Sequence, residues 1–427
     1  MVIANMIGTG IFTSLGFQVV QGGIPDPFSI LVIWILGGVI ALCGAISYCE
    51  VATTIPESGG EYTFLSKIYH PIVGLSSGWV SLIVGFSASI ASLGLAAGEY
   101  LGPLYSTLIP HMPADYMTKF FGILLILIVT VIQLFGVKAS GVFQNFVTYL
   151  KIGFILFIII SPFIFSSKLG YSEISFLPSD ASFNTIFSLP FAGSLVFVMF
   201  AYSGWNASSY IAGNINNPQK TLPHSLLKGT AVVSVLYLLL TFVFLYVCTF
   251  DELAGQVDIG NLVVSKMFGP SFSVLFGVLF SIALISGINA MFIAGPRVAQ
   301  KIGEDYSFFS KLSKQTPKGA PINAILLQAS VSILFILISS FKEIIEYMGI
   351  TLSIFSLLTV LGLFVLRNKK KQGENTVKAW GYPITPLVFI LCTSWMIFYF
   401  VKNDPKVIIW SLLTIIPALP IYFLTKK

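Results

Sequence analysis

MIGTGIF (residues 6–12) places two glycines and a threonine inside the first apolar segment of the chain. FAYSGW (residues 200–205) interrupts a later apolar segment in a similar way, with Ser203 and Gly204. Glycine lowers helix propensity and leaves room for another group to approach the backbone. One such site alone would indicate close packing of helices through small residues. Two sites at corresponding positions favour another interpretation, in which both helices are broken.

The composition is that of a membrane protein. Of the 427 residues, 56% are hydrophobic and 9% are charged, whereas a soluble domain carries about 25% charged residues. A bilayer core requires about 20 mostly apolar residues per helix. We therefore expect an all-α integral membrane protein with twelve spans, of which the longest must tilt, bend or break. The predicted spans are 2–21, 28–49, 71–101, 119–137, 142–166, 184–213, 225–250, 269–298, 322–340, 343–366, 383–401 and 405–424.

The two interruptions fall in the first and the sixth predicted spans. Because five is an odd number, the second set of five spans enters the membrane from the side opposite to the first set. This is the arrangement of an inverted repeat, as in the leucine-transporter fold, where paired interruptions indicate the binding site of a transporter. We expect a single transmembrane domain over 1–427, with repeat one at 1–166, repeat two at 184–366 and two appended helices at 383–424.

The chemistry of a broken helix favours a zwitterionic ligand. Unwinding frees N–H groups at the start of the second half and C=O groups at the end of the first half. The N–H end suits a carboxylate, and the C=O end suits an ammonium group. An amino acid carries both charges on one carbon. The midplane regions of the predicted spans contain no Asp or Glu, which favours neutral substrates, although aromatic faces also bind cations.

The distribution of Lys and Arg predicts the orientation. With the N-terminus in the cytosol, most of these residues fall in segments that face the cytosol. We expect both termini to be cytoplasmic, in a cell membrane that we take to be a bacterial inner membrane. The most basic loop, Arg367–Lys378, either fixes this topology or binds an anionic lipid. Since no polar tail precedes the first span, we also expect that a short cytosolic tail is missing from this sequence.

One predicted cytosolic segment, 50–70, departs from this charge pattern. It contains Glu50, Glu57 and Glu61 against a single lysine, Lys67. An amphipathic run follows two glycines in this segment and predicts a short helix from residue 62 to residue 69. Such a helix would be either part of an inner gate or a plain connector.

Cysteine and histidine do not form a recognisable site. No CxxC pair occurs, and the histidines are far apart in sequence, so we expect no metal, no cofactor and no disulfide framework. A net charge of +6 in a membrane protein does not indicate a nucleic-acid partner. These residues are Cys43, Cys49, Cys248, Cys392, His70, His111 and His224.

Four stretches carry a resemblance to a known family. The chain resembles the amino acid–polyamine–organocation (APC) superfamily, especially the L-type amino acid transporter branch and bacterial serine/threonine exchangers. The resemblance implies a leucine-transporter-like five-plus-five inverted repeat with twelve transmembrane helices, of which helices 1 and 6 are discontinuous. The stretches are MIGTGIF (6–12), IPESGGEYTFL (55–65), FAYSGWNASSYIAGNINNPQKTLP (200–223) and GPRVAQ (295–300).

The resemblance also implies a substrate site at the two breaks. The amides of residues 9–11 would receive the substrate carboxylate. The carbonyls of residues 6, 200, 201 and 203 would receive its amino group, and Phe200 would be an aromatic gate. Family members usually carry an acidic residue where this chain has Asn214, which puts the local contacts of helix 6 in question. The implied site residues are Met6, Gly8, Thr9, Gly10, Ile11, Phe200, Ala201 and Ser203.

Lys151 lies within the fifth predicted span, where a charge is costly. It is either a lysine that snorkels to the cytosolic surface or the helix 5 lysine of the sodium-independent relatives that the chain resembles. In the second case its ammonium takes the place of a sodium ion and bridges helix 5 to helices 1 and 8, with Ser286 as a neighbour. We favour the second case and expect transport without sodium.

The resemblance bears on partners as well. Eukaryotic L-type transporters join a heavy chain through a cysteine in the external loop after helix 3. The corresponding loop, Gly102–Thr118, has no cysteine, so we expect no disulfide-linked partner, only the amino acid substrate and membrane lipid.

The leading hypothesis is sodium-independent transport of neutral amino acids by alternating access, as exchange or with protons. A basic amino acid or polyamine antiporter is the second hypothesis, although a polyamine has no carboxylate for the helix 1 amides. A sensor that binds an amino acid without moving it is the third. An enzyme would need an intramembrane HExxH or paired Asp, and the sequence contains neither. GLSSG (74–78) matches the letters of GxSxG, but that motif acts on a strand-to-helix turn, whereas this segment lies within a predicted helix.

Overall fold

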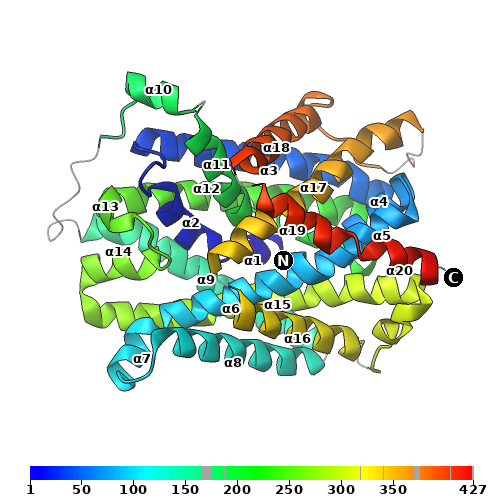
Figure 1. Cartoon of the computed structure of the whole chain (residues 1–427), viewed down its shortest axis with the longest axis horizontal. Helices are drawn as coiled ribbons and strands as arrows, with labels where there is room; N and C mark the ends of the chain where they lie inside the picture. Colours follow the sequence, from blue (N-terminus) through cyan, green and yellow to red (C-terminus); the bar gives the residue numbers. More distant parts are fainter. Residues whose placement is uncertain are drawn as a thin grey trace.

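The computed structural model describes residues 1–135, 137–165, 175–186, 188–317, 319–339, 341–369, 376–403 and 405–425. All regular elements within these residues are helical (Figure 1). In chain order they are α1 (Val2–Met6), α2 (Gly10–Gln18), α3 (Pro27–Thr54), α4 (Glu61–Ile68), α5 (Pro71–Val80), η1 (Ser81–Ala88), α6 (Ser89–Tyr100), α7 (Gly102–Leu108), α8 (Ala114–Leu134), α9 (Val137–Ile164), α10 (Asp180–Ile186), α11 (Leu189–Ala201), η3 (Ala207–Asn214), α12 (Pro218–Val247), α13 (Phe250–Leu253), α14 (Ile259–Phe268), α15 (Pro270–Asp305), η4 (Ser307–Ser313), α16 (Ile322–Ile338), α17 (Phe341–Asn368), α18 (Ile384–Asn403), α19 (Lys406–Ile415) and α20 (Ala418–Thr425).

The helices confirm the predicted class of an all-α membrane protein. Within the described residues, 8 helices are long and apolar enough to cross a membrane, and further shorter apolar helices accompany them. Many leucine, isoleucine and phenylalanine side chains on their outer faces are exposed, as a lipid environment permits. The count of twelve spans stays a prediction, because four of the predicted spans, the first, sixth, ninth and twelfth, contain only shorter helices within the described residues.

Both predicted interruptions are confirmed. The first span divides into α1 and α2, which are separated by Ile7, Gly8 and Thr9. The sixth span divides into α11 and the 3₁₀-helix η3, which begins at Ala207. Between them the chain makes turns, and Gly204 has φ of 87°. That conformation favours glycine over residues with a Cβ, so the glycine in this break is required by the backbone.

The third predicted span also departs from a straight α-helix. It runs through α5, the π-helix η1 and α6 without leaving a helical path. A π-helix is uncommon and often lies at a functional site. The last predicted span, 405–424, contains α19 and α20, which a turn at Ile416 and Pro417 separates. Proline lacks an N–H group and clashes with the preceding turn.

The short helix predicted for the acidic segment is confirmed as α4, which packs against α5 and α17. The basic loop that follows α17 is described only in part, since residues 370–375 lie outside the described residues. At its start, Arg367 donates to both carboxylate oxygens of Glu50, at 2.8 and 2.6 Å. At its end, the Ala379 N–H also donates to Glu50, at 2.6 Å. The buried Glu50 thus ties this loop to α3.

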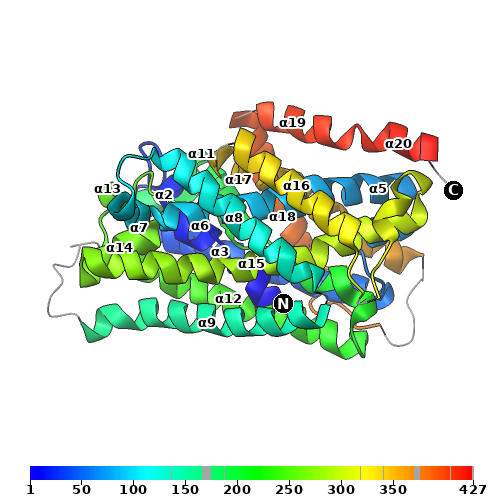
Figure 2. The same ribbon diagram turned by 90° about the horizontal axis from the view of Figure 1, so that it is seen from below.

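The two halves of the first span lie inside the bundle. Helix α1 packs against α12 and α15, and α2 packs against α11. Figure 2 shows α19 and α20 along one outer face of the bundle and α9 along the opposite face, with α1 and α2 between these faces. In the break of the first span Ile7 and Thr9 are buried. Backbone groups without a helical partner are tolerated in a membrane where protein or a cavity surrounds them.

Candidate functional site

The breaks in the first and sixth spans face each other at close range. A Cβ atom added to Gly10 would lie 2.5 Å from the Cα atom of Ala201, and one added to Gly204 would lie 3.1 Å from the backbone carbonyl carbon of Asn5. Side chains at either glycine would push the two breaks apart. Ser14 also donates from its hydroxyl to the Phe197 carbonyl at 3.0 Å, which fixes α2 beside α11.

The start of α2 presents free amide groups. Thr9 is the N-cap residue of α2, and no side chain caps this end of the helix. The N–H groups in the first turn of an α-helix have no acceptor within the helix, and the helix dipole makes this end partly positive. The amides of residues 9–11, which the resemblance assigned to a carboxylate, lie at this end of α2, and the binding of a carboxylate there stays a prediction.

A small cavity of about 30 Å³ lies between the two breaks. Seven of the eight implied substrate residues line it, and Ile11 does not, because its side chain points into the core and is fully buried. A cavity of this size holds about one water molecule, which is less space than an amino acid needs. The lining residues are Asn5, Met6, Gly8, Thr9, Gly10, Ser89, Ser92, Leu93, Phe200, Ala201, Ser203 and Met291.

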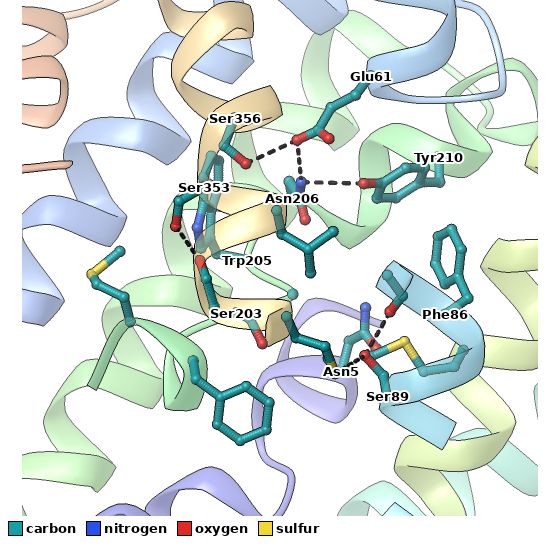
Figure 3. Close-up of a pocket in the computed structure, with 18 of the residues that line it drawn as sticks. Asn5, Glu61, Phe86, Ser89, Ser203, Trp205, Asn206, Tyr210, Ser353 and Ser356 are labelled. Atoms are coloured by element: carbon teal, nitrogen blue, oxygen red, sulfur yellow. Dashed lines mark hydrogen bonds between the residues drawn. The ribbon is translucent and has the colours of Figure 1, made fainter. Parts of the chain in front are cut away.

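A second cavity of about 80 Å³ adjoins the first. The two share five lining residues, which are Asn5, Ser89, Phe200, Ser203 and Met291. Figure 3 shows Asn5 and Ser89 toward one end of this cavity, and a carboxylate, Glu61, among polar side chains at the other. The cavity is lined by the break in the sixth span, by η1 and by α17. The shared residues make the two cavities one continuous region.

The carbonyl groups of both breaks meet at a residue that sequence reasoning missed. The Tyr237 hydroxyl on α12 lies 2.5 Å from the Met6 carbonyl oxygen and 3.1 Å from the Ala201 carbonyl oxygen. A hydroxyl carries one hydrogen, so the two carbonyls share a single donor. Each carbonyl oxygen retains a second lone pair. Tyr237 thus links the ends of α1 and α11 at two of the carbonyls that the resemblance assigned to an ammonium group.

The other two implied carbonyls belong to Phe200 and Ser203. The Phe200 carbonyl accepts the Ser203 N–H at 2.9 Å within the turn that ends α11. The Phe200 side chain lines both cavities and is 8% exposed. The Phe200 ring thus borders both cavities, and its role as a gate stays a prediction.

Lys151 does not snorkel to the surface, since it is 1% exposed. Its ammonium donates to the Ile7 carbonyl at 2.5 Å, which links α9 to the break in the first span. The neighbour expected on α15, Ser286, is fully buried, and its hydroxyl has no hydrogen-bond partner within the described residues. The described bonds therefore connect Lys151 to helix 1 and not to Ser286.

The segment before α4 holds the second half of the sixth span. The Gly59 N–H donates to the Tyr210 carbonyl at 3.0 Å, and the Ser58 hydroxyl donates to the Asn214 side chain at 3.1 Å. A Cβ on Gly60, where φ is 55°, would lie 2.4 Å from the Tyr210 ring. Asn214, where the chain departs from the usual acidic residue, therefore bonds a serine hydroxyl and keeps η3 against this segment.

None of the described His, Cys, Asp and Glu side chains gather in groups of three that could hold a metal ion. The four cysteines have no disulfide partner in the structure, and three of them are buried. The polar groups that surround the two cavities are mainly backbone amides and carbonyls, hydroxyls and side-chain amides. This set of groups binds and orients a small polar molecule.

Two broken helices that face a shared cavity inside a bundle of apolar helices define a membrane transporter rather than an enzyme. The chain belongs to the amino acid permease family, whose sequence model matches residues 1–423. The predicted membership of the APC superfamily is thus confirmed.

Curated relatives match over nearly the whole chain. The serine/threonine exchanger SteT of Bacillus subtilis (strain 168) is 28% identical over 100% of this chain and 95% of its own length. The mouse b(0,+)-type amino acid transporter 1 is 29% identical over 99% of this chain and 85% of its own length. The mouse large neutral amino acids transporter small subunit 2 is 24% identical over 99% of this chain and 78% of its own length.

Proposed function

We propose that this protein carries neutral amino acids across a cell membrane by alternating access, in exchange for another amino acid and without sodium. The observation that carries the proposal is the shared cavity, onto which the uncapped start of α2 and the carbonyl ends of α1 and α11 open. These groups complement the carboxylate and the ammonium of one amino acid. Relatives that are named as an exchanger and as amino acid transporters support the proposal.

In the proposed complex the substrate backbone binds only to backbone groups of the protein. Its carboxylate receives hydrogen bonds from the amides of Thr9, Gly10 and Ile11, beside Gly8. Its ammonium donates to carbonyls of both breaks, at Met6, Phe200, Ala201 and Ser203. The Tyr237 hydroxyl already occupies one lone pair on two of these carbonyls, so the ammonium either uses the second lone pair or displaces the hydroxyl.

The absence of a sodium requirement is proposed from Lys151. A sodium ion at this position would coordinate backbone carbonyls, and the buried ammonium of Lys151 instead occupies the Ile7 carbonyl. A fixed cation that belongs to the protein removes the need for one from solution. Ser286 belongs to the same proposed group, since its buried hydroxyl still has hydrogen-bonding capacity.

Neutral substrates are proposed because the polar side chains in the smaller cavity are uncharged. A basic amino acid remains a second candidate for one reason: the larger cavity is lined by the Glu61 carboxylate, which could attract a cationic side chain. The two candidates differ in which labelled substrate is displaced. We also propose the inverted repeat (1–166 and 184–366), cytoplasmic termini in a bacterial inner membrane and the absence of a disulfide-linked heavy chain.

The test is a counterflow panel in proteoliposomes that contain the purified full chain. Vesicles are loaded with one unlabelled amino acid, and uptake of a labelled one is measured with sodium or choline outside. Stimulation by internal serine, threonine or other neutral amino acids, unchanged in choline, is the expected result. Competition by arginine, lysine or putrescine alone would favour the basic antiporter. Saturable binding without counterflow of any amino acid would favour a sensor.

A further inference from the structure

Glu61 is a buried carboxylate that accepts hydrogen bonds from three separate segments of the chain. It is 2% exposed. Its Oε1 atom accepts hydrogen bonds from the Tyr48 hydroxyl on α3 at 2.5 Å, from the Asn206 side chain at 3.1 Å and from the Ser356 hydroxyl on α17 at 3.0 Å. Asn206 lies within the break of the sixth span. A change in the charge of Glu61 would therefore alter its hydrogen bond to Asn206, which directly precedes η3, the second half of the sixth span.

The donors on Glu61 are all neutral. Within the described residues, no lysine or arginine forms an ion pair with Glu61, and all three described hydrogen bonds fall on Oε1 rather than on Oε2. A buried carboxylate without a cation is costly in its ionised form. Glu61 lines the same cavity as Phe200 and Ser203 (Figure 3). The group is thus enclosed, yet it borders the space through which the proposed substrate would pass.

The titratable groups around Glu61 are phenols, and Glu61 is the carboxyl group among them. The titratable side chains that face it are the phenols of Tyr48 and Tyr210, and tyrosine ionises near pH 10. Burial raises the pKa of the Glu61 carboxyl above its usual range, while the Tyr48, Ser356 and Asn206 hydrogen bonds act in the opposite direction. The nearest acidic residue in the same segment, Glu57, is half exposed and paired with Lys67.

We propose that Glu61 binds a proton during the transport cycle and so couples net amino acid uptake to a proton gradient. This proposal rests on the function proposed above and extends it, since an exchanger alone does not accumulate substrate without a counter-substrate. The proton adds to Oε2 on the side of the carboxyl that the three donors leave free. The added proton removes the negative charge and weakens all three bonds to Oε1, because hydrogen bonds to an ionised acceptor are the stronger ones.

The consequence for the cycle follows from where the donors lie. With Glu61 ionised, the Asn206 and Ser356 bonds hold the second half of the sixth span against α17 and α4. With Glu61 protonated, these contacts weaken, and the half-helix is free to separate from α17. Proton binding therefore favours the conformation in which the cavity opens on the side of α4. Release of the proton to that side returns the bonds to full strength.

The experiment measures accumulation by the full chain in proteoliposomes that contain no internal amino acid. The probe is a labelled neutral amino acid that the counterflow panel accepts, with the outside one pH unit more acidic than the inside. One proton per substrate permits accumulation of up to about tenfold, since one pH unit is a tenfold difference in proton concentration. A pH-sensitive dye inside the vesicles reports whether protons enter with the substrate.

We expect wild-type vesicles to accumulate substrate several-fold and to acidify. In Glu61→Gln vesicles we expect neither effect, and any counterflow that remains should not respond to the pH gradient. Glu57→Gln is the matched control, since it makes the same change in the same segment at the surface. It should behave as wild type. If Glu61→Gln does not fold, Glu61→Asp, whose carboxyl is one methylene shorter, should accumulate substrate with a shifted pH dependence.

The outcomes separate this proposal from the function on which it rests. Wild-type counterflow without any response to the pH gradient, or gradient-driven accumulation that persists in Glu61→Gln, overturns the proton site alone. An unshifted pH dependence in Glu61→Asp does the same. Loss of inhibition by lysine or arginine in Glu61→Gln, with unchanged accumulation, would assign the carboxylate to a cationic substrate instead. Failure of wild type to exchange any amino acid would overturn the proposed function itself.

Discussion

Replacing Gly10 by alanine tests whether the two broken helices must touch for the substrate site to form. The new Cβ would lie 2.5 Å from the Cα atom and 2.8 Å from the Cβ atom of Ala201, whereas carbon atoms in contact prefer about 3.5–4.0 Å. The start of α2 would therefore have to move by about 1 Å from the end of α11. The Cα and Cβ atoms of Ala201 have fixed positions relative to the α11 backbone. No change of side-chain rotamer can therefore relieve the contact.

Excess volume in a packed interior costs about 1–3 kcal/mol. If that cost falls on the closed, substrate-bound conformation, it corresponds to a loss of about 5- to 150-fold in affinity, since 1.4 kcal/mol is tenfold. We expect the half-saturation concentration for counterflow to rise by a factor in this range. The unfolding temperature of the variant in detergent, measured beside its counterflow, distinguishes a loss of binding from a loss of folding.

Gly193→Ala is the matched control, because Gly193 lies on α11 itself and has nothing within 4 Å of an added Cβ. This variant should keep wild-type counterflow and gain up to about 1 kcal/mol of helix stability. An unchanged half-saturation concentration in Gly10→Ala would refute the reasoning, because a site between the two breaks cannot tolerate their separation. The substrate would then have to bind elsewhere in the bundle.

The remaining predictions concern four residues. Lys151→Ala should slow counterflow about tenfold or more, since it removes a charged hydrogen bond to the Ile7 carbonyl worth about 1.5–3 kcal/mol; normal transport with normal thermal unfolding would contradict this role. Tyr237→Phe should weaken counterflow about fivefold, because two backbone carbonyls lose their shared donor, whereas the exposed Tyr149→Phe should have no effect. Thr9→Pro should abolish substrate binding in a thermal-shift assay, because it removes an amide from the carboxylate site; retained binding would move the site. Burial raises the pKa of Asp258 to about 6, above the value of about 3.9 in an unfolded chain, so its ionisation destabilises the fold as pH rises through this window. Asp258→Asn should therefore raise the unfolding temperature more at pH 7.5 than at pH 4.5, and an equal rise at both pH values would exclude this explanation.

The breaks could be predicted because glycine acts through the local backbone. Gly8, Gly10 and Gly204 lower the helix propensity of the segments that contain them. The occurrence of two such segments in corresponding spans then favoured broken helices over close helix packing. The short helix α4 could be predicted for a similar reason, since its apolar residues recur at helical spacing directly after two glycines. Each of these features depends on residues that are close in sequence.

The features that the sequence did not reveal depend on distant residues. Tyr237 lies in an apolar span like many other aromatic residues, and nothing next to it indicates that its hydroxyl reaches Met6, 231 positions away. Glu61 belongs to a connecting segment, so a search for carboxylates within the spans did not include it. The fold nevertheless brings it to the cavity through Asn206, 145 positions away. Turn residues and hydrophobic periodicity indicate local structure, so they do not predict contacts between residues that are this far apart in sequence.

Backbone recognition has a consequence for substrate choice. The amides of α2 and the carbonyls of α1 and α11 are the same for every amino acid, so they cannot distinguish one substrate side chain from another. In the proposed complex, the substrate side chain is distinguished by the residues that line the larger cavity beyond Phe200. There the π-helix η1 contributes Gly85 and Phe86, and α17 contributes Leu352 and Ser353.

The geometry of η1 explains why discrimination falls at this place. A π-helix widens its turn and shifts the side chains that follow it relative to an α-helix, so that Gly85, Phe86 and Ser89 all line one cavity. A Cβ on Gly85 would lie 3.2 Å from the Leu352 side chain, so the missing side chain keeps the space between η1 and α17 open. Changes in η1 and α17 should therefore alter which amino acid is carried, whereas changes at the two breaks should alter whether any amino acid is carried.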